Sequence, residues 1–292
     1  MVTRIRRVAG LTVALGSFVV AYAAEHRSTS SEIEALRREV AMSRPARESG
    51  LDRVAAGLGG LGALPTPRAD GPGRDATLDR WQPVLAEIEA LPRADLATVT
   101  EPRVFAAGRI GLALALTAER ECARGASARC EALLVRAATV ASAMRGSGSL
   151  VGAAFASRVL REVARVAEAH RDRLGDDARA DLAATRWSSP AEVTAGLRQG
   201  HLRNVLGWLD GPAETTAERV FVRGLVRREM ALDATRSLDQ HLATFGAAYR
   251  EGASSSLCAA AMLDRSGEIE CRQLDGLREG DRAAERLHAL AR

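Results

Sequence analysis

Residues 105–118 read FAAGRIGLALALTA, a run in which Arg109 is the only charged residue. A helix that is apolar on nearly every face is stable only where other elements cover it on most sides. We therefore predict a central helix over this run, with the rest of the fold packed around it. Its expected partners are the segment 150–169 and a stripe at helical spacing, which consists of Leu133, Leu134, Ala137, Val140 and Met144.

The composition favours helices through the body of the chain. Apolar residues make up 47% of the 292 residues and charged residues 27%, a balance that allows a buried core. Aromatic residues are only 3%, whereas Ala, Leu, Arg and Glu, which are strong helix formers, are abundant. Turn residues divide the body into roughly eight to ten helical segments. We predict an all-α fold, a multi-helix bundle, with an irregular α-solenoid as the alternative.

The first 24 residues have the pattern of a membrane-targeting segment. Three arginines within the first seven residues precede the uncharged run 8–24, as in a basic n-region followed by an apolar h-region. As a helix this run would be about 25 Å long, at the short end of what spans a bilayer. Residues 21–23 read AYA, a small-x-small cleavage pattern. The sequence thus leaves open a retained signal anchor and a signal peptide cleaved after Ala23.

In either case we expect the rest of the chain to lie beyond the membrane. The anchored form would be a single-pass protein of the bacterial inner membrane with its C-terminal domain in the periplasm, and the cleaved form would be periplasmic or secreted. The net charge of +4 fits this reading, because outside residues 1–24 the remaining 38 arginines face 37 acidic residues. The basicity therefore belongs to the targeting signal and does not indicate a nucleic-acid partner.

Three segments follow the targeting signal. Residues 25–43 are predicted to form a short stalk helix, in which Ile33, Leu36 and Val40 keep heptad spacing. Residues 44–76 contain four Pro and seven Gly and are predicted to be a flexible linker with a span of roughly 30 Å. Residues 77–292 are predicted to form one α-helical domain.

The four cysteines form two local pairs, Cys122 with Cys130 and Cys258 with Cys271. On an unbroken helix the members of these pairs would lie about 12 and 19 Å apart, beyond the roughly 7 Å between Cα atoms that a disulfide allows. A glycine-containing turn lies within each pair, so we predict two helical hairpins, each closed by a disulfide, as suits an oxidising compartment. Free buried thiols are one alternative. A zinc site is the other, although these spacings are wider than structural zinc sites use.

The sequence excludes several kinds of catalytic chemistry. All 41 basic residues are Arg, so the chain cannot form a Walker A loop, a Schiff base or a Ser-x-x-Lys site. The five His form no H-E-x-x-H pair, and no G-x-S-x-G motif occurs. Gly57, Gly59 and Gly62 match G-x-G-x-x-G, but no strand before it and no helix after it is predicted. We expect no cofactor, and no catalytic or metal site with a linear motif.

Two arginine-rich stretches are candidates for contacts. Arg219, Arg223 and Arg227 lie at intervals of four on a predicted helix, with Arg228 adjacent. Like charges placed this way repel, and an acidic partner or a phosphate would compensate them. We interpret these four as a candidate partner or anion contact, with a solvated face as the alternative. The segment 158–172 alternates Arg with Glu and Asp at helical spacing, which predicts ion pairs within one solvated helix.

Together these features predict a membrane-tethered extracytoplasmic helical protein that acts by protein–protein interaction in the cell envelope, as a scaffold or adaptor. Its expected partners are the membrane, through residues 8–24, and an envelope protein. The alternative is an enzyme or a small-ligand carrier whose site is assembled from distant residues such as His170, His201 and Trp208. A purely structural spacer is the third reading.

Overall fold

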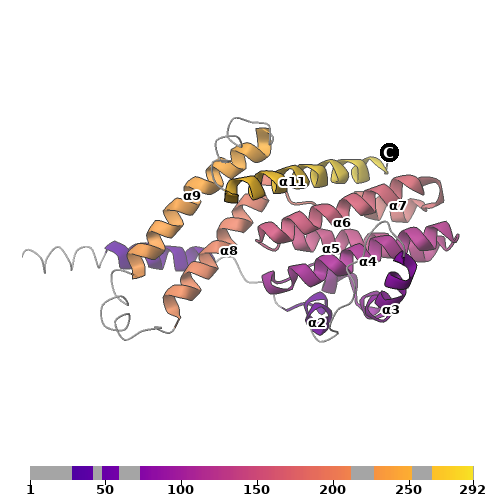
Figure 1. The fold of residues 1–292 in the computed structure, drawn as a ribbon, viewed down its shortest axis with the longest axis horizontal. Helices are drawn as coiled ribbons and strands as arrows, with labels where there is room; N and C mark the ends of the chain where they lie inside the picture. Colours follow the sequence, from indigo (N-terminus) through magenta and orange to yellow (C-terminus); the bar gives the residue numbers. More distant parts are fainter. Residues whose placement is uncertain (1–27, 42–47, 59–72, 212–226, 252–264, 292) are drawn as a thin grey trace, which may run out of the picture. The chain divides into compact units, whose positions relative to one another are not determined.

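The computed structural model describes residues 28–41, 48–58, 73–211, 227–251 and 265–291 (Figure 1). Within these ranges the regular structure is ten α-helices and three short 3₁₀ helices, with no strand. The all-α prediction is therefore confirmed. The chain divides into two units, one of Met1–Arg44 and His201–His241, the other of Pro45–Gly200 and Leu242–Arg292. The domain boundaries expected from the sequence, with one α-helical domain over 77–292, stay a prediction.

The larger unit is a helical bundle built around α4 (Val104–Ala123). Every residue from Ile110 to Ala118 is buried, so the apolar run is the central helix that the sequence predicts. It packs against α5 (Ser127–Arg145) and α6 (Leu150–Ala169), and α11 (Arg265–Ala289) packs on α6 (Figure 1). The predicted stripe from Leu133 to Met144 is fully buried in this core.

Shorter elements close the rest of the core. α3 (Arg74–Ala90) contributes the fully buried Trp81, and α7 (Asp176–Ala183) contributes Leu182. A second apolar cluster joins residues 190–200 of α8 (Pro190–Asp210) to residues 242–251 of α9 (Arg227–Glu251) and to α11. The 3₁₀ helices are Arg93–Leu96, Glu101–Arg103 and Arg171–Arg173.

The segment predicted to be a linker contains a helix of the core. α2 (Gly50–Gly57) begins with a capping box. The Ser49 side chain accepts a hydrogen bond from the Asp52 amide, and the Asp52 side chain accepts one from the Ser49 amide. Asp52 also accepts from the amide and hydroxyl of Thr100, at 2.8 and 2.9 Å. Leu51 is fully buried against the core. The flexible-linker prediction is therefore wrong for residues 50–57, because a local cap and a buried leucine fix them.

In the smaller unit the predicted stalk is a helix over residues 28–41. Its Ile33 is buried against Val205 and Leu206 of α8 and against Ala231 and Leu232 of α9. Leu36 and Val40, the other members of the heptad stripe, pack on the same cluster. The stripe is thus covered within the chain, and the helix is part of a small core.

The predicted membrane segment, residues 1–24, lies outside the described residues. Among the helices that are described, none combines the length and the apolar character that crossing a bilayer requires.

Candidate functional site

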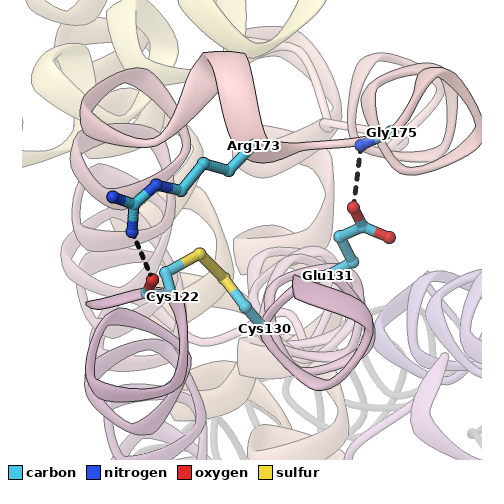
Figure 2. The surroundings of a disulfide bond; sticks show 5 residues. All are labelled: Cys122, Cys130, Glu131, Arg173 and Gly175. Carbon is cyan, nitrogen blue, oxygen red and sulfur yellow. Dashed lines mark hydrogen bonds between the residues drawn. A yellow bond between two sulfur atoms is a disulfide. The ribbon is translucent and has the colours of Figure 1, made fainter. Parts of the chain in front are cut away.

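One disulfide joins the end of α4 to the start of α5 (Figure 2). Cys122 and Cys130 are bonded with their Cα atoms 5.2 Å apart. Gly125, at φ +83°, supplies the left-handed residue of the reversal between them. The first of the two predicted staples is therefore confirmed. Cys258, which belongs to the second pair with Cys271, lies outside the described residues, so that pairing stays a prediction.

Two polar contacts fix the connection after α6 against this hairpin (Figure 2). Arg173 donates to the carbonyl oxygen of Cys122 at 2.7 Å, and the amide of Gly175 donates to a carboxylate oxygen of Glu131 at 2.7 Å. The disulfide-linked hairpin is thus hydrogen-bonded to the end of the bundle where the 3₁₀ helix Arg171–Arg173 leads into α7.

We expect removal of this disulfide to destabilise the bundle. The bond closes a loop with a sequence separation of eight residues, for which loop entropy alone corresponds to about 2.5 kcal/mol. The double variant Cys122→Ala/Cys130→Ala should lose about that much unfolding free energy in urea titrations followed by circular dichroism. Ser127→Ala in the same turn is the control and should change it by less than about 0.5 kcal/mol. A double variant as stable as the wild type would contradict the expectation.

A buried arginine connects four elements of the larger unit. The side chain of Arg145, at the end of α5, has no exposed surface. It donates to the carbonyl oxygen of Ser188 at 2.8 Å, to Asp281 of α11 at 2.6 Å and to the hydroxyl of Tyr249 in α9. Its guanidinium also lies over the ring of Trp187, 4.3 Å from the centroid. We call these residues the Arg145 hub.

The positive charge of the Arg145 guanidinium is compensated within the hub. Asp281 accepts from Trp187 Nε1 at 2.8 Å as well as from Arg145, so its charge is held by two donors. Burial raises the pKa of the Tyr249 phenol well above its usual value, which keeps this group neutral beside the guanidinium. The Arg145 hub is accordingly a structural ion pair.

A hollow of about 370 Å³ lies over α6, between α4 and α11. We call it the arginine hollow, and it is lined by Leu112, Leu116, Arg158, Arg161, Glu162, Arg165, Glu168 and Arg286. Four arginines and two carboxylates line it, and two further carboxylates, Glu119 and Glu279, pair with Arg165 and Arg161. The two leucines come from the buried central helix and supply an apolar floor.

Two of the four arginines are held by carboxylates. Arg165 pairs with Glu162 at 2.5 Å and with Glu119 at 2.9 Å, and these hydrogen bonds raise its pKa. Burial alone would raise the pKa of Glu119, but hydrogen bonds from Arg165 and Arg74 outweigh it and lower that pKa. Arg286 pairs with Glu168 at 3.2 Å.

The other two arginines are less completely compensated. Arg158 is exposed and makes no hydrogen bond or ion pair with the part of the chain that the structure describes. Arg161 pairs with Glu279 of α11, yet its Nε is buried and has no hydrogen-bond partner among the described residues. Burial, and then the charge of Arg158, lower the pKa of Arg161.

The prediction of ion pairs within one solvated helix over 158–172 is therefore only partly right. Arg165 and Glu162 do pair within α6. Arg161 and Glu168 instead pair with α11, because α11 packs along this face of α6. Sequence spacing identified the charged residues but could not identify the neighbouring helix.

The arginines that the sequence singled out occupy a different setting in the smaller unit. Arg227 is buried, with its guanidinium 4.6 Å from the centroid of the Trp208 ring, and it donates to the carbonyl oxygen of Gly211. Arg228 donates to Ser30 Oγ at 2.9 Å. Arg227 thus differs from the solvated-face alternative, because it is buried, and the partner or anion contact of these arginines stays a prediction. Arg219 and Arg223 lie outside the described residues.

The three residues proposed for a site assembled from distant positions belong to different units. His170 follows the last residue of α6 in the larger unit, whereas His201 and Trp208 lie on α8 in the smaller one. In the described part of the chain, no group of three or more His, Cys, Asp or Glu side chains could hold a metal ion.

An aromatic pair with one exposed ring lies on α4 and α6 of the larger unit. Phe105 is 60% exposed, and its ring meets that of Phe155 edge to face with centroids 5.1 Å apart. Phe155 and Val151, one helical turn apart on α6, are half-buried and pack on the core. The sequence placed Phe105 inside the apolar run and so gave no indication of its exposure.

No protein family, no curated protein and no solved structure matches this chain. The function must therefore be argued from the residues themselves.

Proposed function

We propose that this protein is tethered to the bacterial inner membrane through residues 8–24 and binds another protein of the cell envelope from the periplasmic side. The targeting pattern supports the location. The disulfide between Cys122 and Cys130 also supports it, because disulfides persist in oxidising compartments and are rare in the cytosol.

The observation that carries the binding role is the aromatic pair in which the exposed Phe105 meets the half-buried Phe155. Single exposed apolar residues are ordinary, but two rings held edge to face are a preformed contact. Aromatic side chains are enriched at protein interfaces, where they fill pockets of the partner and supply much of the binding energy. The pair lies on two helices of the bundle core, so little conformational freedom is lost when a partner covers it.

Site-specific photo-crosslinking in living cells tests both parts of this proposal. A photoreactive residue at position 105 should give a discrete crosslinked product with an envelope protein. The matched control is position 177, an exposed residue in the first turn of α7, which should give none. Once the partner is identified, Phe105→Ala should weaken its binding by about tenfold or more, as loss of a central aromatic anchor does.

Protease treatment of spheroplasts locates the body of the chain. Residues 77–292 should be degraded without lysis if they are periplasmic. Protection of the body until lysis would contradict the location, and equal products from positions 105 and 177 would contradict the role of the aromatic pair.

A further inference from the structure

We propose that the smaller unit lies on the bilayer surface, with the exposed side chains of Trp208 and Met230 inserted at the level of the lipid headgroups. This inference rests on the membrane tether of the proposed function, and it adds a second membrane contact to that of residues 8–24. The occupant of this surface is lipid, whereas the aromatic pair of Phe105 and Phe155 is assigned to a protein partner.

The tether leaves the smaller unit little distance from the membrane. The uncharged run ends at Ala24, and the helix over residues 28–41 follows after three residues. The four Cα-to-Cα steps from residue 24 to residue 28 span at most about 14 Å when fully extended, and the headgroup layer is itself roughly 5–8 Å thick. Ile33 fixes this helix in the core of the smaller unit. A membrane-spanning run over 8–24 therefore keeps the whole unit at the bilayer surface.

The smaller unit has the exposed apolar side chains that such a position uses. Three large apolar side chains are exposed in the described part of the chain, and two of them belong to this unit. Trp208 is 40% exposed and Met230 is 54% exposed. Trp combines a large apolar ring with an N–H donor and is enriched at the membrane–water interface for that reason. Met is an unbranched, flexible apolar side chain that adapts to an irregular surface.

Polar and ring contacts connect these two side chains to the first turn of the helix that follows the tether. Arg228 of α9 donates to Oγ of Ser30, which belongs to that turn, at 2.9 Å. The guanidinium of the adjacent Arg227 lies 4.6 Å from the centroid of the Trp208 ring. Met230 is less than one helical turn further along α9. The exposed side chains thus lie in the part of the smaller unit to which the tether connects.

Charge does not explain a membrane contact of this unit. Its described residues include six Arg and seven Asp or Glu, so anionic headgroups do not attract it on balance. Insertion of apolar side chains is then the source of the contact. We therefore expect the contact to form with zwitterionic lipids and to persist at high salt.

Fluorescence quenching by vesicles of brominated phosphatidylcholine tests the contact on the reconstituted full chain. Bromine atoms on the acyl chains quench a Trp ring only when the two come close together. Trp81 has no exposed surface and Trp187 stacks on the guanidinium of Arg145, so Trp208 is the ring that lipid can reach. The vesicles should quench the wild-type emission to the same extent at low and at high salt. Trp208→Phe should lose most of this quenching.

A second variant tests Met230 and supplies a gain of signal. Trp208→Phe/Met230→Trp places a ring at the other exposed position and should restore the quenching that Trp208→Phe loses. The emission that remains in Trp208→Phe comes from Trp81 and Trp187 in the larger unit, and it is the internal control, because lipid should leave it unchanged.

Alkaline carbonate extraction of cell membranes tests the tether separately. Release of the chain by carbonate would contradict the tether itself. If the chain is retained in the membrane but Trp208 is not quenched, only the contact of the smaller unit with lipid is overturned. Quenching that is equal in the wild type and in Trp208→Phe, or that disappears at high salt, would overturn it as well. A dimer that depends on Trp208, found in place of quenching, would assign this surface to a second copy of the chain.

Discussion

Arg145→Met should cost about 3–5 kcal/mol of unfolding free energy, the largest loss we expect from any single substitution. The variant removes a guanidinium that has no exposed surface and leaves the partly buried carboxylate of Asp281 with Trp187 Nε1 as its remaining donor. Removing one member of a buried ion pair typically costs about 3–5 kcal/mol. It also removes the hydrogen bond to the carbonyl oxygen of Ser188 and the stacking on Trp187. Urea titration of the purified full chain, followed by circular dichroism, measures the loss.

A double variant separates the buried charge from the packing of the side chain. Arg145→Met/Asp281→Leu removes both charges, and replacing a buried ion pair by apolar groups is often nearly neutral. It should recover more than half of the loss, although the Nε1 of Trp187 then lacks its acceptor. Arg179 of α7 pairs with the exposed Asp176. The unfolding free energy of Arg179→Met should therefore stay within about 1 kcal/mol of that of the wild type. A double variant no more stable than Arg145→Met would contradict this account of the Arg145 hub.

Gly280→Val should destabilise the larger unit by about 3 kcal/mol, because α11 crosses α6 at this residue. A Cβ at position 280 would lie 2.4 Å from Ser157 Oγ, 2.6 Å from its Cβ and 2.9 Å from its Cα. The last of these is a backbone atom, so the two helices must move apart. Forcing extra methyl groups into a packed interior typically costs about 1–3 kcal/mol, and the backbone contact places this site at the upper end.

The same helix supplies the control for Gly280. Gly276 lies four residues earlier on α11, and a Cβ there would meet no atom within 4 Å. Gly276→Ala should therefore stabilise the protein by about 0.5–1 kcal/mol, as expected for a glycine replaced within a helix. Adding Ser157→Gly to Gly280→Ala should recover stability relative to Gly280→Ala alone, since the nearest obstructing atoms belong to the serine side chain. Equal effects of alanine at positions 276 and 280 would show that the crossing is not close.

Local sequence patterns were sufficient to predict those features that depend on a single helix or a single turn. The run 105–118 predicted α4 from its own periodicity, and the turn around Gly125 predicted the Cys122–Cys130 disulfide from chain length and reach. Both inferences depend only on residues close together in the chain, where geometry per residue is nearly constant.

The flexible-linker prediction failed where distant residues determine the structure. Proline and glycine content indicated a linker over 44–76, yet both residues of the capping box of α2 also bond to residues about fifty positions away, Ser49 to the carbonyl oxygen of Thr98 and Asp52 to the amide of Thr100. Overall composition could not reveal this contact. A closer reading of the Ser49 and Asp52 spacing would have indicated the cap, although not the partners that bury it.

The Arg145 hub could have been suspected from periodicity. Leu134, Ala138, Ala141 and Arg145 follow one another at intervals of three and four residues, and all four are buried. A charged residue on an apolar stripe needs compensation. The stripe does not say which carboxylate provides it, and Asp281 is 136 residues away.

The helical class, the central helix and one disulfide could be predicted without coordinates, because they follow from composition, periodicity and reach along the chain. The tertiary structure decided which charges pair, since Coulombic attraction and desolvation depend on the neighbours that packing brings together and not on spacing within a helix. It buried Arg227 beside Trp208, joined Arg145 to Asp281, and left Arg158 and the Nε of Arg161 without acceptors among the described residues. For the same reason the arginine hollow depends on three helices, α4, α6 and α11, that are far apart in the sequence.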